Sequence, residues 1–306
     1  MTLMAITRRR PSAAGGTRGF IVVAVLWMLA ALAALVLIYL TYVTNTAVTV
    51  AANTDHVQAD ALVNSAVELA AYQLTAKGEA RPTSGTFDAR IGAGRVSVTF
   101  RSEAARIDLN AAPKGLLSGL MIGLGISETD AARYADRIIA WRASIEAGSD
   151  DPENSYYRTL GSAYLPRHAP FPHVDELWLV RGIPPAVIER MLPFVTVFSN
   201  MRTVNLLDAA PQVLAGLPGM TPEALQQLLR DRADPNVNPR SLLGIAGAGS
   251  ATLEGSKAYR LTVAVESALR RRSSAEIVIL LLEGTDEPYR VLSWHNDLDG
   301  SAGKPL

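Results

Sequence analysis

Oxygen-bearing side chains gather between residues 150 and 154 of this 306-residue chain, in the stretch best suited to hold a metal ion. Asp150, Asp151, Glu153 and Asn154 supply carboxylate and amide oxygens, the ligands that calcium prefers. Glycine, serine and proline beside them are typical of an exposed turn. Two interpretations stay open, a calcium site and a solvated surface loop. Calcium is the only cofactor that the sequence suggests.

Patterns that indicate catalysis are weak. The four histidines, at positions 56, 168, 173 and 295, lack the spacing of metal ligands. Gly123-Leu124-Gly125 has no third glycine at the step that a dinucleotide loop requires, and residues 247–250 lack the lysine of a phosphate-binding loop. The chain has no cysteine, which excludes thiol catalysis and disulfides. We therefore expect a protein that is not an enzyme.

The charge balance argues against a polyanion as the main partner. The chain has 29 basic and 29 acidic residues and a formal net charge of zero. Proteins that bind nucleic acid through its phosphates usually have a basic surface. Nucleic acid is therefore an unlikely partner on composition alone.

An apolar run from Phe20 to about Leu40 is the strongest organising feature. Arginines precede it, and no charged side chain occurs again until Asp55. About 20 apolar residues can cross a bilayer core of about 30 Å as one helix. The arginines place the amino terminus in the cytoplasm and the body on the far side of the membrane. A plain signal anchor has the same hydropathy and is one alternative.

The junction before this run is distinctive. In a secretory signal peptide the cleavage site follows the apolar core, but here a basic leader rich in small residues ends at Gly19 and Phe20 begins the core. This junction resembles the processing site of type IV prepilins and of the pseudopilins of type II secretion. The resemblance implies that a prepilin peptidase cuts after Gly19 and that Phe20 becomes the N-methylated first residue.

The fifth position after the expected cut narrows the resemblance. Pilins usually have a glutamate there, which pairs with the amino terminus of the subunit above, whereas this chain has Ala24. A carboxylate at membrane depth is costly without a partner. The absence of that glutamate is similar to the minor pseudopilin K family, and it implies a subunit with none above it.

The remaining patterns predict an α+β fold in which a long helix packs on an antiparallel sheet. No proline or glycine lies between Phe20 and Lys77, and the second half of this helix is amphipathic. Alternating apolar residues from Thr86 to Arg101, around Gly92-Ala93-Gly94, predict a hairpin. Three further strands are expected near the carboxyl end, and the apolar run 276–283 is expected to be the central one.

A helical segment separates these two groups of strands and contains an internal repeat. Residues 107–113 and 204–211 are similar, with one residue inserted in the second copy, and each leads into a leucine-rich helix and a glycine turn. We expect Pro113 in the first turn of its helix, a helix from Glu128 to Arg142 and another starting at His173. The minor pseudopilin K family has a similar inserted helical domain, which residues 107–113 and 171–183 resemble.

The sequence therefore predicts two similar helix-hairpin modules inserted into a pilin-like sheet. The expected parts are a leader (1–19), the transmembrane half (20–40) and amphipathic half (41–78) of the helix, the first part of the sheet (82–106), module 1 (107–200), module 2 (201–250) and the last strands (256–296).

Glycine turns between short helices leave a second hypothesis. Arg181-Gly182-Ile183 and two similar turns resemble the helix-hairpin-helix units that hold DNA backbone on their turn amides. The alternative function is thus a membrane-anchored periplasmic DNA-binding protein. Only Arg181 adds a basic residue at such a turn, which favours packing without a ligand.

The resemblance implies a role in assembly. It implies a single-pass inner-membrane protein with a periplasmic body that caps the tip of the type II secretion pseudopilus and initiates its assembly for protein export. Its expected partners are the I-type and J-type minor pseudopilins, the major pseudopilin and the prepilin peptidase.

Overall fold

The computed structural model describes residues 17–76, 81–145, 151–246, 249–266, 272–284 and 287–297, without the side chains of 17–19, 46–56 and 297. The chain divides into two compact units, Met1–Gln58 and Ala59–Leu306.

The first unit is dominated by α1 (Thr17–Ala76), a helix of 60 residues that continues into the second unit. The prediction of one uninterrupted helix is confirmed. Phe20–Asn45 has a mean hydropathy of 3.0 and none of it is buried within the protein. By length and composition this segment can cross a membrane, so an N-terminal apolar helix of this kind fits a single-pass anchor.

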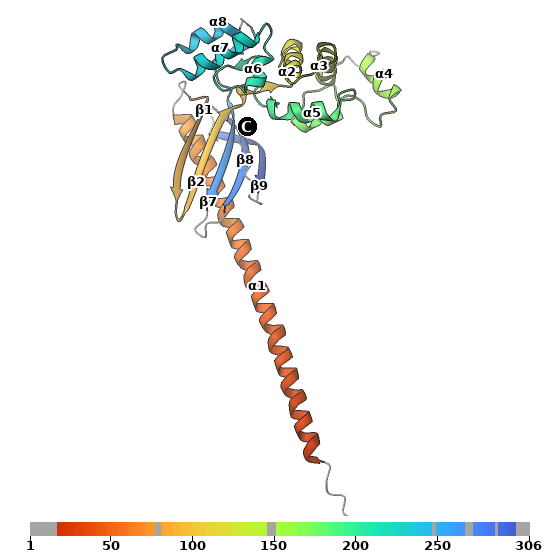
Figure 1. Cartoon of the computed structure of the whole chain (residues 1–306), viewed down its shortest axis with the longest axis vertical. Coiled ribbons are helices and arrows are strands. Elements are labelled where there is room, and N and C mark those ends of the chain that lie inside the picture. The colour runs from red at the N-terminus through yellow and green to blue at the C-terminus, as the bar shows by residue number, and fades with distance from the viewer. Residues whose placement is uncertain are drawn as a thin grey trace, which may run out of the picture. The chain divides into compact units, whose positions relative to one another are not determined.

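The second unit contains an antiparallel sheet of five strands, visible side by side in Figure 1. The strands are β1 (Ser84–Ile91), β2 (Gly94–Ser102), β7 (Ala258–Glu266), β8 (Arg272–Leu281) and β9 (Tyr289–Asp297), in the order β1-β2-β7-β8-β9. β1 and β2 form the predicted hairpin around a turn in which Gly92 has a φ of 58°, a conformation that glycine adopts without strain.

One face of the sheet packs on residues 59–76 of α1. Alternate residues of β2 and β7 point to this face, because successive side chains of a strand point to opposite sides. The helix contributes small residues such as Ala66 and Ala70, which allow a close approach to the strands. The buried residues from both sides are Val63, Ala66, Val67, Ala70, Ala71, Leu74, Val96, Val98, Phe100, Tyr259, Leu261, Val263, Val265, Ala275, Ile277, Ile279 and Leu281.

The prediction that residues 276–283 form the central strand is wrong in one respect. β8 is an interior strand, but β7 is the middle of the five. The apolar run reflects burial on both faces, since Ile277 and Ile279 pack on the helix side and Val278, between them, is also buried. Burial on two faces does not distinguish the middle strand from its interior neighbour.

A helical insertion lies between β2 and β7, in yellow to cyan in Figure 1. Its elements are η2 (Glu103–Ala105), β3 (Ile107–Asp108), α2 (Lys114–Gly123), α3 (Glu128–Arg142), α4 (Pro152–Thr159), η3 (Val174–Leu179), α5 (Pro185–Met191), η4 (Leu192–Phe194), β4 (Val195–Thr196), β5 (Val204–Asn205), α6 (Pro211–Ala215), α7 (Pro222–Ala233), η5 (Pro239–Ser241), α8 (Leu242–Ala246) and β6 (Ala251–Thr252). Their buried side chains form a core of their own, separate from that of the sheet.

Two short parallel strand pairs divide the insertion into modules. β3 pairs with β4, and β5 pairs with β6. We call the segment Ile107–Thr196 the first module and Val204–Thr252 the second module. Each begins with a strand, continues through two helices joined at a glycine, and closes with the partner of its first strand.

The internal repeat is confirmed, but the predicted inserted residue is not present. Leu109 N donates to Thr196 O, and Leu206 N donates in the same way to Thr252 O. Asp108 O accepts from Ala112 N, as Asn205 O accepts from Ala209 N. Positions 107–113 therefore correspond one to one to positions 204–210. The sequence suggested an insertion because Pro113 corresponds to position 210, whereas the proline of the second copy is Pro211.

Two expected helix starts also need correction. Pro113 precedes α2 as its N-cap residue, whereas Pro211 is the first residue of α6. Both places suit proline, because neither requires an intrahelical N–H bond. The helix expected from His173 is a 3-10 helix, η3, with the His173 side chain accepting from Asp175 N at 3.3 Å. The predicted helix Glu128–Arg142 is confirmed as α3.

Candidate assembly sites and the junction between sheet and insertion

The expected processing site lies at the start of the described chain. Gly19 is within α1, and the side chain of Phe20 is 76% exposed. Ala24 is partly exposed on the same helix. Residues 1–16 of the expected leader lie outside the described residues. Cleavage after Gly19, methylation of Phe20 and the meaning of Ala24 therefore stay predictions.

The acidic loop is only partly described, because Asp150 lies outside the described residues. Asp151 is the N-cap of α4, where its Oδ2 accepts from Asn154 N at 2.9 Å. The same oxygen lies 3.3 Å from His168 Nε2, and Asn154 Oδ1 lies 3.1 Å from that nitrogen. The side-chain oxygens of Asp151 and Asn154 are therefore already engaged with partners inside the protein. Capping of this kind is a structural role in its own right.

Glu153, the fourth candidate calcium ligand, is engaged with α3. Its Oε2 lies 2.5 Å from Arg137 Nη1, and the Arg137 guanidinium lies 3.6 Å from the centre of the Tyr156 ring. Burial raises the pKa of the Glu153 carboxyl, and Arg137 opposes this shift. Among the residues that the structure describes, no group of three or more His, Cys, Asp or Glu residues could hold a metal ion. Calcium binding with Asp150 stays a prediction.

The loop that opens each module is held by one polar side chain. In the first module Asp108 Oδ1 accepts from Asn110 N at 2.7 Å and from Ala111 N at 3.2 Å. In the second module Asn205 Oδ1 accepts from Leu207 N at 2.7 Å and from Asp208 N at 3.2 Å. Both side chains are buried.

An arginine from the second helix of each module closes the same loop. Arg142 of α3 donates to Leu109 O and, at 2.6 Å, to Ala112 O. Arg232 of α7 donates to Leu206 O at 3.3 Å and to Ala209 O at 2.7 Å. Burial lowers the pKa of both guanidinium groups, which nevertheless remain charged at neutral pH. The sequence repeat identified the loops but not these two arginines.

The two modules meet where glycines face each other. A Cβ atom at Gly119 of α2 would lie 1.9 Å from the carbonyl oxygen of Gly216, and one at Gly216 would lie 2.5 Å from Leu120 N. No side chain fits between backbones at such distances. The glycines therefore fix how closely the first module packs on the second.

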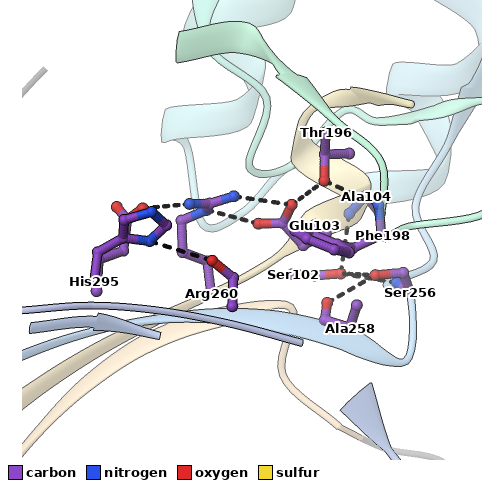
Figure 2. A network of polar contacts seen from close by, with 11 residues as sticks. Ser102, Glu103, Ala104, Thr196, Phe198, Ser256, Ala258, Arg260 and His295 are labelled. Carbon is purple, nitrogen blue, oxygen red and sulfur yellow. Dashed lines mark hydrogen bonds and ion pairs between the residues drawn. The ribbon is translucent and has the colours of Figure 1, made fainter. Parts of the chain in front are cut away.

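A buried ion pair joins the insertion to the sheet, as Figure 2 shows. Glu103 of η2 is 1% exposed, and its Oε1 accepts from Arg260 Nε of β7 at 2.8 Å. Its Oε2 accepts from Thr196 Oγ1 of β4 and, at 3.3 Å, from Arg260 Nη2. Arg260 also pairs with Glu276 of β8. Burial alone would lower the pKa of Arg260, but the two carboxylates outweigh burial and raise it.

Two serines hold the entry and the exit of the insertion together (Figure 2). Ser256 N donates to Ser102 Oγ at 2.8 Å, and the two hydroxyl oxygens lie 3.1 Å apart. Ser256 Oγ donates to Ala258 O at 2.8 Å. Because Glu103 and both serines already have partners, this junction suits mechanical connection between sheet and insertion rather than acid-base chemistry.

Comparisons with known proteins agree with this architecture. Residues 100–200 match the family model described as type II secretion system (T2SS), protein K. The fold is similar to a chain in the crystal structure of the GspK-GspI-GspJ complex from the enterotoxigenic Escherichia coli type 2 secretion system. That match has a TM-score of 0.56 and 16% identity, and it covers 80% of this chain and 98% of that chain. No curated protein matches the chain in sequence.

The N-terminal apolar helix, the antiparallel sheet and the helical insertion form an α+β fold that is similar to the fold of that chain. The segment that matches the family model, residues 100–200, includes the whole first module. Residues 100–200 are therefore similar to the type II secretion system protein K family, and the fold is similar to that of a chain in the GspK-GspI-GspJ complex. That family is a structural component of a secretion system.

Proposed function

We propose that this protein caps the tip of the type II secretion pseudopilus and initiates its assembly, without catalysis of its own. The observation that carries the proposal is the helical insertion between β2 and β7, whose first part, up to residue 200, matches the protein K family model. An insertion of this size, Glu103 to Lys257, adds bulk that a subunit stacked within a regular fibre must avoid.

Ala24 supports a terminal position. A subunit inside the fibre needs a carboxylate near membrane depth to receive the amino group of the neighbour above it, because an unpaired charge there is costly. Ala24 offers only a methyl group. The amino group of Phe20 stays available to pair with a carboxylate of the subunit below. This chain can therefore bind a subunit below it, but it offers no carboxylate to a subunit above it.

Processing by a prepilin peptidase is the first step of the proposed pathway. The apolar segment Phe20–Asn45 would then stay attached as the membrane anchor. Gly19→Val should leave the leader in place, because the cut requires a small residue. Gly16→Val is the matched control within the leader and should be processed normally. Terminal sequencing of the mature protein should begin at Phe20, and any other first residue would contradict this step.

The proposed partners are the other minor pseudopilins. GspK is crystallised in a complex with GspI and GspJ, and the fold of this chain is similar to that complex's K subunit. We propose that this chain likewise binds I-type and J-type pseudopilins in the inner membrane, with its body in the periplasm. Co-purification in detergent with these subunits from the same bacterium tests the proposal. Failure of all three to associate at micromolar concentration would count against it.

DNA binding at the glycine turns is the alternative function. Gly125 and Gly219 have φ values of 83° and 79° and do form hairpins between helices. However, Glu128 and Asp130 lie in the first turn of α3, and Glu223 lies in that of α7. Carboxylates at a helix start repel phosphate groups. Salt-dependent DNA binding by the full chain would favour this alternative, and we expect none.

A further inference from the structure

A cavity of about 460 Å³ lies between the end of β2, η4 and the loop that opens the second module. Its walls come from four separate stretches of the sequence, which contribute Arg101 and Arg106, Phe194, Asp208, and Arg232. Ligand sites in proteins typically measure about 300–1,000 Å³. The cavity is therefore large enough for a side chain or a small molecule, and it is larger than a single inorganic ion requires.

Three guanidinium groups face this cavity against one carboxylate. Arg101, Arg106 and Arg232 line it together with Asp208, so the formal charge of the lining residues is +2. Asp208 Oδ1 already accepts from Ser84 Oγ at 2.5 Å. Within the described part of the chain, none of the three arginines forms a salt bridge.

The arginines are close enough to affect one another. Burial lowers the pKa of Arg106 most, followed by the charge of Arg260; the carboxylates of Glu103 and Glu276 oppose this shift, and Arg101 adds to it. Burial also lowers the pKa of Arg232, where the Asp208 carboxylate opposes the shift and Arg101 adds to it. Convergence of like charges in a partly buried space is unfavourable unless an anion joins them. An anion is therefore the kind of group that could join Arg101 and Arg106 at this cavity.

The geometry of the side chains indicates what kind of anion fits. Arg232 is fixed by its bonds to Leu206 O and Ala209 O, and the side chains of Arg101 and Arg106 line the same cavity. A guanidinium fork binds the two oxygens of a carboxylate side by side. Apolar walls formed by Pro193, Phe194 and Val213 suit a short apolar stem behind that carboxylate.

We propose that this cavity binds a carboxylate on a short apolar stem, held by Arg101 and Arg106 with Arg232 fixing the far wall. Two sources carry this chemistry, the acidic side chain of a polypeptide and a free carboxylic acid. Binding at this cavity does not require the protein to cap a fibre, so its failure would leave the proposed function intact.

Isothermal titration calorimetry on the full chain in detergent micelles tests the proposal. The probes are glutarate and its neutral analogue glutaramide, and then acetyl-Ala-Ala-Glu-Ala-Ala-amide and the same peptide with glutamine. Glutarate or the glutamate peptide should bind with an affinity that falls with salt, and the neutral analogues should not bind. Tighter binding of the peptide identifies a polypeptide as the source. Binding of glutarate alone identifies a free acid.

Arg101→Gln is the decisive variant, because Arg101 is exposed and no hydrogen bond of its side chain is lost on substitution. Loss of a charge-assisted hydrogen bond should weaken binding about 10-fold or more. Arg158→Gln, an exposed arginine of α4 outside the cavity, is the matched control and should bind as the unaltered chain does. Equal binding by Arg101→Gln, equal binding of glutaramide, or no binding of either acidic probe would overturn the proposal.

Discussion

Asp108 in the first module and Asn205 in the second occupy equivalent positions. In each, one side-chain atom, Oδ1, binds the opening loop, but the other atom faces hydrogen-bond donors in the first module and acceptors in the second. Asp108 Oδ2 accepts from Ser199 Oγ at 3.0 Å and from Asn200 N at 2.7 Å. Asn205 Nδ2 donates to Leu253 O at 2.9 Å and to Glu254 O at 3.0 Å. The carboxylate stands where two donors point inward, and the amide stands where two carbonyl oxygens do.

The modules also differ in size around a shared plan. α3 has 15 residues and α7 has 12, but each has in its last turn an arginine that donates to two carbonyl oxygens of its module's opening loop. The first module also carries α4, η3 and α5 before its closing strand. Both modules thus hold the opening loop by one buried side chain and one arginine. Whether that buried side chain is a carboxylate or an amide depends on whether donors or acceptors face its second atom.

The largest effect should come from forcing a charge into the second module. Asn205→Asp would place a buried carboxylate against the carbonyl oxygens of Leu253 and Glu254, at a cost of about 3–5 kcal/mol in the free energy of unfolding. Chemical denaturation of the full chain measures the loss. Protonation relieves the repulsion, so the loss should shrink as the pH falls below the raised pKa of the new carboxyl.

Asn238→Asp is the control for this substitution. Asn238 is an exposed N-cap whose Oδ1 accepts from Arg240 N at 3.0 Å, and aspartate caps a helix about as well as asparagine. It should change stability by less than about 0.5 kcal/mol. A similar loss for both variants would show that the two carbonyl oxygens do not select the amide.

The contact between modules should be the next most sensitive place. Gly119→Ala would put a methyl group 1.9 Å from Gly216 O, and overpacking of this kind costs about 1–3 kcal/mol. Gly115→Ala lies on the same helix, where the new methyl would meet Pro218 Cγ at 3.7 Å, an ordinary contact. The control should be neutral or slightly stabilising. Equal melting temperatures for the two variants would contradict a close approach of α2 and α6.

The reciprocal change in the first module should cost less. Asp108→Asn turns an NH₂ group toward Asn200 N, so one partly buried donor loses its acceptor, at about 1–2 kcal/mol. Asp136→Asn removes only an exposed ion pair with Lys114 and should cost about 0–1 kcal/mol. Thermal unfolding of both variants measures the difference. A stable Asp108→Asn variant would mean that either side chain serves in the first module.

The features that could be predicted from the sequence are those that depend on residues close together in the chain. The uninterrupted run after Phe20, the alternation around Gly92 and the Ser127-capped stripe of α3 each contain their own signal. The repeat register was missed by one residue, because proline is tolerated both before and at the first position of a helix.

Contacts between distant residues left no such signal. Glu103 and Arg260 are 157 residues apart, and their pairing depends on the insertion returning to the sheet. The arginine-lined cavity likewise exists only where four separate stretches of the chain converge. The acidic loop was visible in sequence, but the donors that occupy it, Arg137 and His168, were not.

Calcium should have the smallest effect, and only on the first module, which alone carries the acidic loop. Calcium must compete with the existing partners of Asp151, Glu153 and Asn154, so we expect a dissociation constant near 1 mM. At that concentration it stabilises by about 0.4 kcal/mol, or about 1–2 °C in the melting temperature. Asp150→Ala combined with Asp151→Ala should remove this rise. Magnesium at equal concentration is the control, and an equal rise would indicate ionic strength alone.

The position of the protein in the fibre tests the central claim most directly. Sheared pseudopili that carry this chain with a carboxyl-terminal epitope can be labelled with gold-conjugated antibody and examined by electron microscopy. We predict label at one end of each fibre, as expected if Ala24 and the insertion together exclude a subunit above, which is what we propose. Label at regular intervals along the fibre would contradict the proposed role as a tip-forming minor pseudopilin.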